Sequence, residues 1–397
     1  MAQAILSGQD EAIALLRAAL STGHVGHAYL FHGPAGVGKT RAALWFARAL
    51  LCESPRPGGD PCDACAACRA SAALRHPDLD LLLPLPTFRT EGRTERQADE
   101  ARSEARAAAI ARYAAEPYFT PTFTRPGVHS VEDLARAKQF LAMTAQREGG
   151  RKVLIVKGAE AMTGPAAHAF LKILEEPQPE RVLILGARQV RGLLPTIASR
   201  CLHVRFRPLP VEFVAKALTE GFGVSRPVAR LAAATAQGSL GRAAAPFAAP
   251  LDGTGKDAPD EAEFSRLRAA ALELFVRPRS AAILTPLRKA RLERDRGRFL
   301  TTVSLAIHYY RDAIRTKVAG EGTPLAHEDL KREIAADARA LPLRTLTGRV
   351  RTLEEIAAAV QSNVTVAYAV AAARRRMGLA AAPEPESPRA RSGGRTR

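Results

Sequence analysis

The sequence has few aromatic residues and no apolar run long enough to cross a membrane. Only 5% of its 397 residues are Phe, Trp or Tyr. No apolar run approaches the ~20 residues that a membrane-spanning helix needs, so we expect no membrane partner. The start of the chain also lacks the basic segment and apolar core of a secretory signal. These absences predict a cytoplasmic protein.

Acidic residues are also in short supply. The chain has 40 Asp and Glu against 58 Lys and Arg, which gives a formal net charge of +18 and a pI near 10.4. Such an excess indicates a polyanionic partner, most simply a nucleic acid. The arginines are scattered rather than arranged in stripes, so a composition inherited from a GC-rich genome explains the charge equally well.

What the sequence does contain is enough apolar material for sizeable cores. Hydrophobic residues make up 47% of the chain, and its length predicts two or three domains. Strand and helix patterns alternate in the first half, whereas only helix patterns follow Pro208. We therefore expect an α/β domain at 1–207, a small three-helix unit at 208–250, an all-α domain at 251–376 and a disordered basic tail at 377–397.

Local patterns give the expected elements of the first two units. Buried strands are predicted at 27–32, 153–156 and 181–186. Helices of the α/β domain are predicted at 41–51 and 165–176. Helices of the three-helix unit are predicted at 211–221, 228–237 and 239–249.

A phosphate-binding loop lies between the first predicted strand and helix. The segment 33–40 matches G-x-x-x-x-G-K-[ST]. Gly33, Gly36 and Gly38 let the backbone curl so that amides point inward, and the following helix adds the positive end of its dipole. Lys39 is expected to reach the β- and γ-phosphates, and the Thr40 hydroxyl is the group that ligates Mg²⁺ in such loops.

Four of the five cysteines follow directly on the helix behind this loop. Cys52, Cys62, Cys65 and Cys68 have the spacing C-x9-C-x2-C-x2-C, within a module at 52–68. Four thiolates complete the tetrahedral shell of a structural Zn²⁺. Disulfides and a redox pair are the alternatives, and both are disfavoured in a reducing compartment with this clustering. Cys201 stands alone and is expected to pack in the interior.

An inserted segment at 84–127 interrupts the α/β domain. It is rich in proline at both ends, and its middle, 89–112, is charged and alanine-rich. This composition predicts an exposed helix within a charged surface loop. The sequence assigns no function to it.

Several motifs in series resemble the AAA+ clamp-loader subunits of bacterial DNA polymerase III. Besides the loop and the cysteines, these are GHVGHAYLFHG at 23–33, HPD at 76–78, FLKILEEP at 170–177 and SRC at 199–201. The resemblance covers about residues 1–245. It implies an AAA+/RecA-like P-loop domain with a zinc knuckle, a helical lid and an all-α collar domain for oligomerisation.

The departures from that family concern the hydrolytic residues. Motor subunits place Asp-Glu after the strand at 153–156, where this chain has Lys157 and Gly158. A lysine opposes Mg²⁺ and a glycine cannot orient water, so Mg²⁺ binding is not expected, although ATP or ADP can still bind. Glu160 follows two residues too late and is expected to point elsewhere.

Two further departures lie at nucleotide-sensing positions. Ala187-Arg188 replaces the polar residue that active motors carry after the next strand. In the lid, the segment 238–242 has glycine where motors carry a sensing arginine, and Arg242 is one residue further along. The chain thus resembles the non-motor, delta-prime class of these subunits, with little or no ATPase activity of its own.

This resemblance implies a stator in a hetero-oligomeric ring at the replisome. Its partners would be the tau/gamma motor subunits, the delta subunit, the sliding clamp and primed DNA. Arg200 would act in trans as an arginine finger on a neighbour's γ-phosphate. The alternatives are a tau/gamma-type motor, which needs the acidic pair, and a zinc-dependent nucleic-acid-binding module with a vestigial nucleotide fold.

Overall fold

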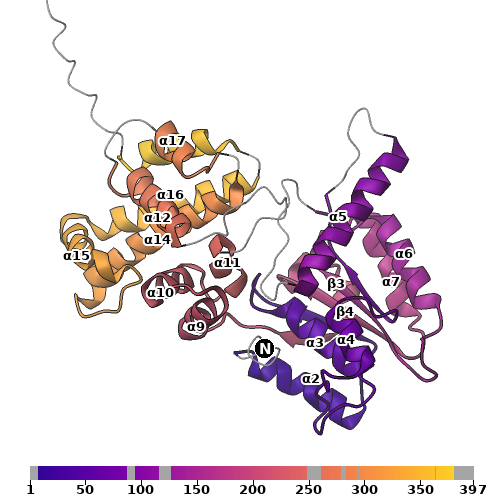
Figure 1. The fold of residues 1–397 in the computed structure, drawn as a ribbon. Coiled ribbons are helices and arrows are strands. Elements are labelled where there is room, and N and C mark those ends of the chain that lie inside the picture. The colour runs from indigo at the N-terminus through magenta and orange to yellow at the C-terminus, as the bar shows by residue number, and fades with distance from the viewer. Residues whose placement is uncertain are drawn as a thin grey trace, which may run out of the picture. The chain divides into compact units, whose positions relative to one another are not determined.

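The computed structural model describes residues 8–86, 94–115, 127–247, 261–278, 283–293, 295–362 and 364–379. The chain divides into two compact units, Met1–Ala258 and Pro259–Arg397 (Figure 1). The finer predicted boundary at 207 stays a prediction. The predicted basic tail lies outside the described residues from position 380 onward.

The first unit is built on a parallel five-stranded sheet in the order β2-β3-β4-β1-β5. The strands are β1 (Ala28–His32), β2 (Leu79–Leu82), β3 (Lys152–Lys157), β4 (Arg181–Ala187) and β5 (Leu202–Arg205). The register pairs His32 with Ala187, and Lys157 with Gly186. The segments that follow β1, β3 and β4 therefore meet at one edge of the sheet, where α/β proteins bind ligands.

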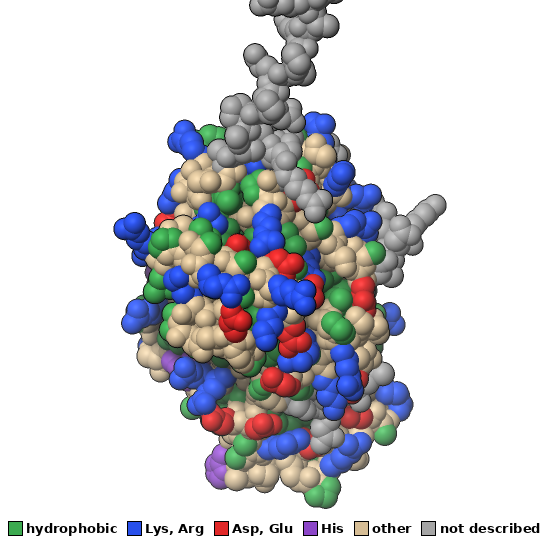
Figure 2. Space-filling view, turned by 90° about the vertical axis from the view of Figure 1, so that its left-hand side faces the viewer, with side chains coloured by type: hydrophobic (Ala, Val, Ile, Leu, Met, Phe, Trp, Pro, Cys, Tyr) green, Lys and Arg blue, Asp and Glu red, His purple; other side chains and the backbone are tan. Residues whose placement is uncertain are grey.

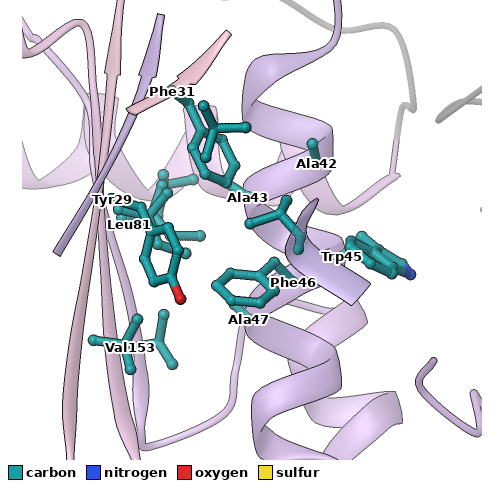
Figure 3. Packing of buried hydrophobic residues seen from close by; sticks show 14 of the residues in the cluster. Tyr29, Phe31, Ala42, Ala43, Trp45, Phe46, Ala47, Leu81 and Val153 are labelled. Atoms are coloured by element: carbon teal, nitrogen blue, oxygen red, sulfur yellow. The ribbon is translucent and has the colours of Figure 1, made fainter. Parts of the chain in front are cut away.

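Helices cover both faces of the sheet because the strand residues alternate between two apolar clusters. Tyr29 and Phe31 face α2 (Asp10–Thr22) and α3 (Lys39–Leu51), while Leu30 faces the opposite side. Phe46 of α3 packs against Tyr29 (Figure 3), and their ring centroids are 5.1 Å apart. The helices on the opposite face are α6 (Val131–Ala142), α7 (Gly164–Glu175) and α8 (Pro195–Ala198).

The inserted segment at 84–127 contains a helix, α5 (Glu95–Ala115), that is only partly exposed. Ala109 and Tyr113 are 0% and 2% exposed and belong to the same core as α3. Arg102 and Arg106 form ion pairs with Asp133 and Asp80. The prediction of an exposed helix in a charged loop is therefore wrong for the second half of α5. Its buried stripe consists mostly of alanines, which give a weak apolar signal.

The lid consists of three short helices, as the sequence predicts. They are α9 (Val211–Phe222), α10 (Arg226–Thr235) and α11 (Leu240–Ala244), followed by the 3-10 turn η3 (Ala245–Phe247). Together with the parallel sheet and the loop before α3, they give the α/β P-loop architecture that the sequence predicts.

The second unit is helical throughout its described residues. Its helices are α12 (Glu261–Phe275), α13 (Leu284–Lys289), α14 (Arg296–Ala319), α15 (Lys331–Ala340), α16 (Leu343–Gln361) and α17 (Val366–Arg376), with the 3-10 turn η4 (Glu328–Leu330). The long helix α14 is central and packs against α12, α15 and α16. None of the helices in the described ranges is both long and apolar enough to cross a membrane.

Candidate phosphate site and cysteine cluster

The loop between β1 and α3 has a backbone that requires glycine. Gly33, Gly36 and Gly38 have φ values of 141°, 72° and 103°, which L-residues with side chains rarely adopt. A Cβ on Gly33 would also lie 2.1 Å from the carbonyl oxygen of Phe206. Gly38 caps α3 without any side-chain hydrogen bond. The first-turn amides, including that of Thr40, are therefore available to an anion.

Lys39 lies over this loop and contacts the loop's own backbone. Its Nζ donates to the carbonyl oxygens of Gly33 and Pro34, both at 2.5 Å. Burial lowers the pKa of Lys39 to about 8, and Arg188 adds to the lowering while Glu160 opposes it. A phosphate oxygen would be a stronger, charged acceptor for the same ammonium group. The sequence-predicted residues at 33–40 are thus brought together in the arrangement that phosphate binding needs.

Two contacts from other parts of the chain hold the loop. Gln9 is 6% exposed, and its Nε2 donates to the carbonyl oxygens of Val37 at 3.2 Å and Arg207 at 2.7 Å. On the lid side, the Gly241 amide donates to the Gly36 carbonyl oxygen at 3.0 Å. The lid backbone at position 241 therefore contacts the loop directly. Gln9 was not predicted, because a lone polar residue before a helix carries no specific signal.

The end of β3 is cationic where a motor would be acidic. Lys157 is the last residue of the strand, and its Nζ donates to the Tyr113 hydroxyl and lies 5.1 Å from the centre of that ring. The Arg41 guanidinium lies 5.7 Å from the same ring centre. Burial, together with the charges of Arg188, Lys39 and Arg41, lowers the pKa of Lys157 to about 7, and the charge of Glu160 opposes this shift.

Glu160 lies beside the site, contrary to the prediction that it points elsewhere. It belongs to the 3-10 turn η1 (Ala159–Ala161), which follows Gly158 in the left-handed region at φ 65°. Its Oε1 accepts the Arg188 amide at 3.2 Å, and its charge raises the pKa of both Lys39 and Lys157. The tight turn at Gly158 directs the chain back toward the sheet edge, which sequence spacing alone does not reveal.

The four cysteines form a compact group at the end of α3 and the start of α4 (Ala66–Ala72). Their sulfur atoms all lie within 4.8 Å of one another. The Cys52–Cys65 and Cys62–Cys68 sulfur pairs are 4.0 and 3.8 Å apart. A tetrahedron of sulfurs about 2.3 Å from a central ion has edges of about 3.8 Å. The group could therefore hold a metal ion.

Backbone amides further prepare these sulfurs for a cation. The amides of Ala64 and Cys65 donate to Cys62 Sγ at 3.4 and 3.3 Å, and the Cys68 amide donates to Cys65 Sγ at 3.3 Å. The two amides on Cys62 lower the pKa of its thiol to about 6, whereas burial raises the pKa of Cys68. N–H donors favour the thiolate, which is the form that ligates metal.

Ion pairs attach the cysteine module to the helices of the α/β domain. Arg17 of α2 makes two hydrogen bonds to the Asp60 carboxylate, both at 3.0 Å, and its guanidinium lies 5.7 Å from the Trp45 ring centre. Arg48 of α3 pairs with Asp63 at 3.2 Å. The module thus has a fixed position behind the phosphate loop.

Arg200 follows α8 and has a partly exposed side chain. Its Nη2 lies 3.1 Å from Glu175 Oε1 at the end of α7, and its Nη1 donates to the Thr196 carbonyl oxygen at 3.1 Å. Two of the motifs singled out in the sequence, at 170–177 and 199–201, are therefore joined by an ion pair. Cys201 is buried, as predicted, and its thiol donates to the Ile197 carbonyl oxygen at 3.2 Å.

A buried ion pair lies at the opposite end of β3. Asp78 accepts from Lys152 Nζ at 2.9 Å and from the Gln146 amide at 2.9 Å, with side-chain exposures of 5% and 3% for Asp78 and Lys152. His76 Nδ1 in turn accepts the Asp78 amide at 3.0 Å. The HPD motif at 76–78 therefore serves the fold rather than a reaction.

The surface charges are mixed on the face that Figure 2 shows. Lys and Arg side chains alternate there with Asp and Glu, and they are not gathered into one basic patch. The expectation of a nucleic-acid partner therefore stays a prediction.

Comparisons with known proteins agree with the motifs. The family model described as DNA polymerase III, delta subunit matches residues 8–210. The chain is 38% identical to subunit delta' of Pseudomonas aeruginosa over 199 residues, which are 49% of this chain and 48% of that protein. It is 26% identical to subunit delta' of Bacillus subtilis over 367 residues, or 90% and 92% of the two chains. It is 32% identical to subunit gamma/tau of Mycobacterium tuberculosis over 203 residues, 51% and 28% of the two chains.

The first of these relatives is matched over about half of its length, and the second over almost all of it. The family model covers the phosphate loop, the cysteine cluster, the end of β3 and Arg200. The resemblance drawn from the motifs is confirmed: the chain belongs to the DNA polymerase III delta-subunit family, and its relatives include DNA polymerase III delta' subunits.

Proposed function

We propose that this chain is a non-motor subunit of the DNA polymerase III clamp loader, acting as a stator during loading of the sliding clamp on primed DNA. One observation carries the proposal: an intact phosphate loop lies beside a strand end that holds Lys157 and Gly158. Nothing at these two positions can hold Mg²⁺ or orient water. The chain therefore retains ATP or ADP on the loop without hydrolysing it at a useful rate.

Arg200 is the residue through which a stator would act. Its guanidinium is partly exposed, and among the described residues Glu175 and Thr196 are its partners. A planar fork with free donors suits two oxygens of a phosphate group. In the assembled ring, Arg200 would complete the site of a neighbouring tau/gamma motor, where such a finger contributes roughly 10³–10⁵ in rate.

The cysteine cluster would hold one structural Zn²⁺. Four thiolate ligands fill the tetrahedral shell and leave no position for substrate, so the ion supplies stability rather than chemistry. Cys65→Ser should lower zinc content to well below one ion per chain and lower the midpoint of thermal unfolding. Cys201→Ser is the matched control, since Cys201 lies outside the cluster. A wild-type protein purified without chelator that contains no zinc would contradict the assignment.

Reconstitution of the loader tests the stator proposal. The mutant chain would be combined with wild-type tau/gamma and delta subunits, and ATP hydrolysis and clamp loading would be measured with primed DNA. Arg200→Ala should leave assembly and zinc content intact and reduce both rates, and Arg200→Lys should restore them only in part.

Arg147→Ala is the control for Arg200→Ala, because Arg147 is exposed and precedes β3 at the opposite edge of the sheet. Equal rates for wild type and Arg200→Ala would remove the trans-acting role. A turnover of about 1 s⁻¹ by the isolated chain would instead favour a motor.

A further inference from the structure

The edge of the sheet beside the phosphate loop carries an excess of positive charge. Lys39 and Arg41 begin α3, Lys157 ends β3 and Arg188 follows β4. The charges of Lys39, Arg41 and Arg188 all act on Lys157. Among the described residues whose charge acts on Lys157, Glu160 is the one acidic residue. Its carboxylate also forms an ion pair with Arg188 at 3.8 Å.

Lys157 itself has no carboxylate partner in the described contacts. Its ammonium group is held by the neutral hydroxyl and the ring face of Tyr113, which α5 supplies from the inserted segment. Arg41 lies over the same ring. Tyr113 is 2% exposed and carries no negative charge, so these contacts fix the Lys157 side chain in place and give it no counterion. A bound phosphate would favour its protonated form.

The position of Lys157 matters because of what the fold places next to it. The sheet register pairs Lys157 with Gly186 of β4. Strand β4 in turn pairs with β1, at whose carboxyl end the phosphate loop begins. A cation near the phosphates is what Mg²⁺ provides in metal-dependent sites. Here a fixed protein cation lies at that edge, and it would repel a divalent ion that tried to share the site.

We propose that the loop binds the phosphates of a nucleoside di- or triphosphate without a divalent metal ion, with the Lys157 ammonium supplying the positive charge of the missing ion. This inference rests on the proposal that the loop retains nucleotide. It accounts for the survival of the loop together with the loss of the acidic pair. It also gives the inserted helix α5 a role, because Tyr113 holds the substituting cation.

Titration of the full-length protein with ADP and with ATP tests the inference, once in excess EDTA and once in excess Mg²⁺. We expect binding in EDTA that is at least as tight as in Mg²⁺. Lys157→Met should weaken the EDTA affinity by about tenfold or more, a loss typical of one charged contact to the ligand. Lys216→Met, at an exposed lysine of the lid helix α9, should leave it unchanged.

Two further variants keep the test decisive. If Lys157→Met does not fold, Lys157→Gln removes the same charge with a polar side chain. Lys157→Asp should reverse the preference, so that nucleotide binds only when Mg²⁺ is present. Wild-type binding that requires Mg²⁺, or a Lys157→Gln variant with unchanged EDTA affinity, would overturn the inference.

The stator proposal is judged separately. If no nucleotide binds in EDTA or in Mg²⁺, the metal-free site is ruled out. A rate of ATP hydrolysis or clamp loading that depends on Arg200 in the reconstituted loader would still support the stator proposal. If nucleotide binds without metal but Arg200→Ala leaves the rates of the reconstituted loader unchanged, the metal-free site stands and the trans-acting role of Arg200 fails.

Discussion

Strand β3 carries a lysine at each end, and the two lysines are satisfied in opposite ways. At the amino end, Lys152 is paired with the Asp78 carboxylate at 2.9 Å in a buried environment. At the carboxyl end, Lys157 has only the neutral side chain of Tyr113 as its close partner in the described structure. One end is an internal ion pair that belongs to the fold. The other has no close carboxylate among the described contacts, and this difference is the basis for the anionic ligand proposed at that edge.

The largest expected effect comes from breaking the amino-terminal pair. Lys152→Met leaves the Asp78 carboxylate buried without its cation, which should lower the free energy of unfolding by about 3–5 kcal/mol. Denaturant unfolding at pH 7 measures this. The double variant Lys152→Met/Asp78→Asn should recover much of the loss, because no unpaired charge remains. Equal stabilities of the single and double variants would show that the pair is not the cause.

The carboxyl-terminal lysine should make stability depend on pH. The pKa of Lys157 is about 7 in the folded protein, below the ordinary lysine value of 10.5, so the unfolded chain keeps this proton up to a higher pH. The unfolded state therefore binds more protons between these values, and the free energy of unfolding should rise with pH by up to about 1.4 kcal/mol per unit. Below about pH 7 both states are protonated and this contribution levels off.

Lys157→Met tests this slope, since it removes the titrating group and should flatten the rise between pH 7 and 9. Part of the slope above pH 8 will remain, because the pKa of Lys39 is also lowered, to about 8. Lys216→Met provides a control at an exposed lysine. An unchanged slope in Lys157→Met would mean that the ammonium is not buried as described.

Removing the hydroxyl that holds Lys157 should have a moderate effect. Tyr113→Phe keeps the ring that both Lys157 and Arg41 contact but deletes the hydrogen-bond acceptor. We expect a loss of about 1–3 kcal/mol at pH 7, because the ammonium group is left without its acceptor. Urea unfolding of Tyr113→Phe at pH 7 and 9 measures it, and the loss should shrink at pH 9, where Lys157 is mostly neutral.

The smallest expected effect concerns the ion pair that holds Arg200. Glu175 and Arg200 have side-chain exposures of 48% and 38%, so Glu175→Gln should change the free energy of unfolding by less than about 1 kcal/mol. A larger loss on thermal unfolding would mean that the pair supports the fold. Such a result would weaken the proposal that Arg200 is free to reach a neighbour.

The parts of the molecule that follow from short stretches of sequence were predicted well. The cysteine cluster, the phosphate loop and strands β1, β3 and β4 each depend on residues close together in the chain. Strands β2 and β5 were not predicted, because both have four residues and β5 is largely exposed. Helix α6 was also missed, although Ser130 and Asp133 form a capping box at its start.

The sheet edge beside the loop could not be predicted, because distant segments build it. Lys157 was identified as a departure, but its contact with Tyr113 joins residues 44 positions apart. The burial of α5 and the return of Glu160 to the site depend on how the chain folds back after Gly158. The hydrophobic pattern of one segment predicts which of its faces is apolar, but it does not predict which charged residues from distant segments lie close together.

The hydrogen bond from the Gly241 amide to the Gly36 carbonyl oxygen has an evolutionary consequence. Both groups belong to the main chain, so at position 241 only proline deletes the donor. Position 36 is different, because a Cβ there would lie 2.2 Å from Ser239 Oγ and the backbone has φ 72°. The joint between lid and loop can therefore persist while the surrounding sequence drifts. A lineage that lost its hydrolytic residues would still inherit the closed arrangement of these two elements for as long as it kept the glycine at 36.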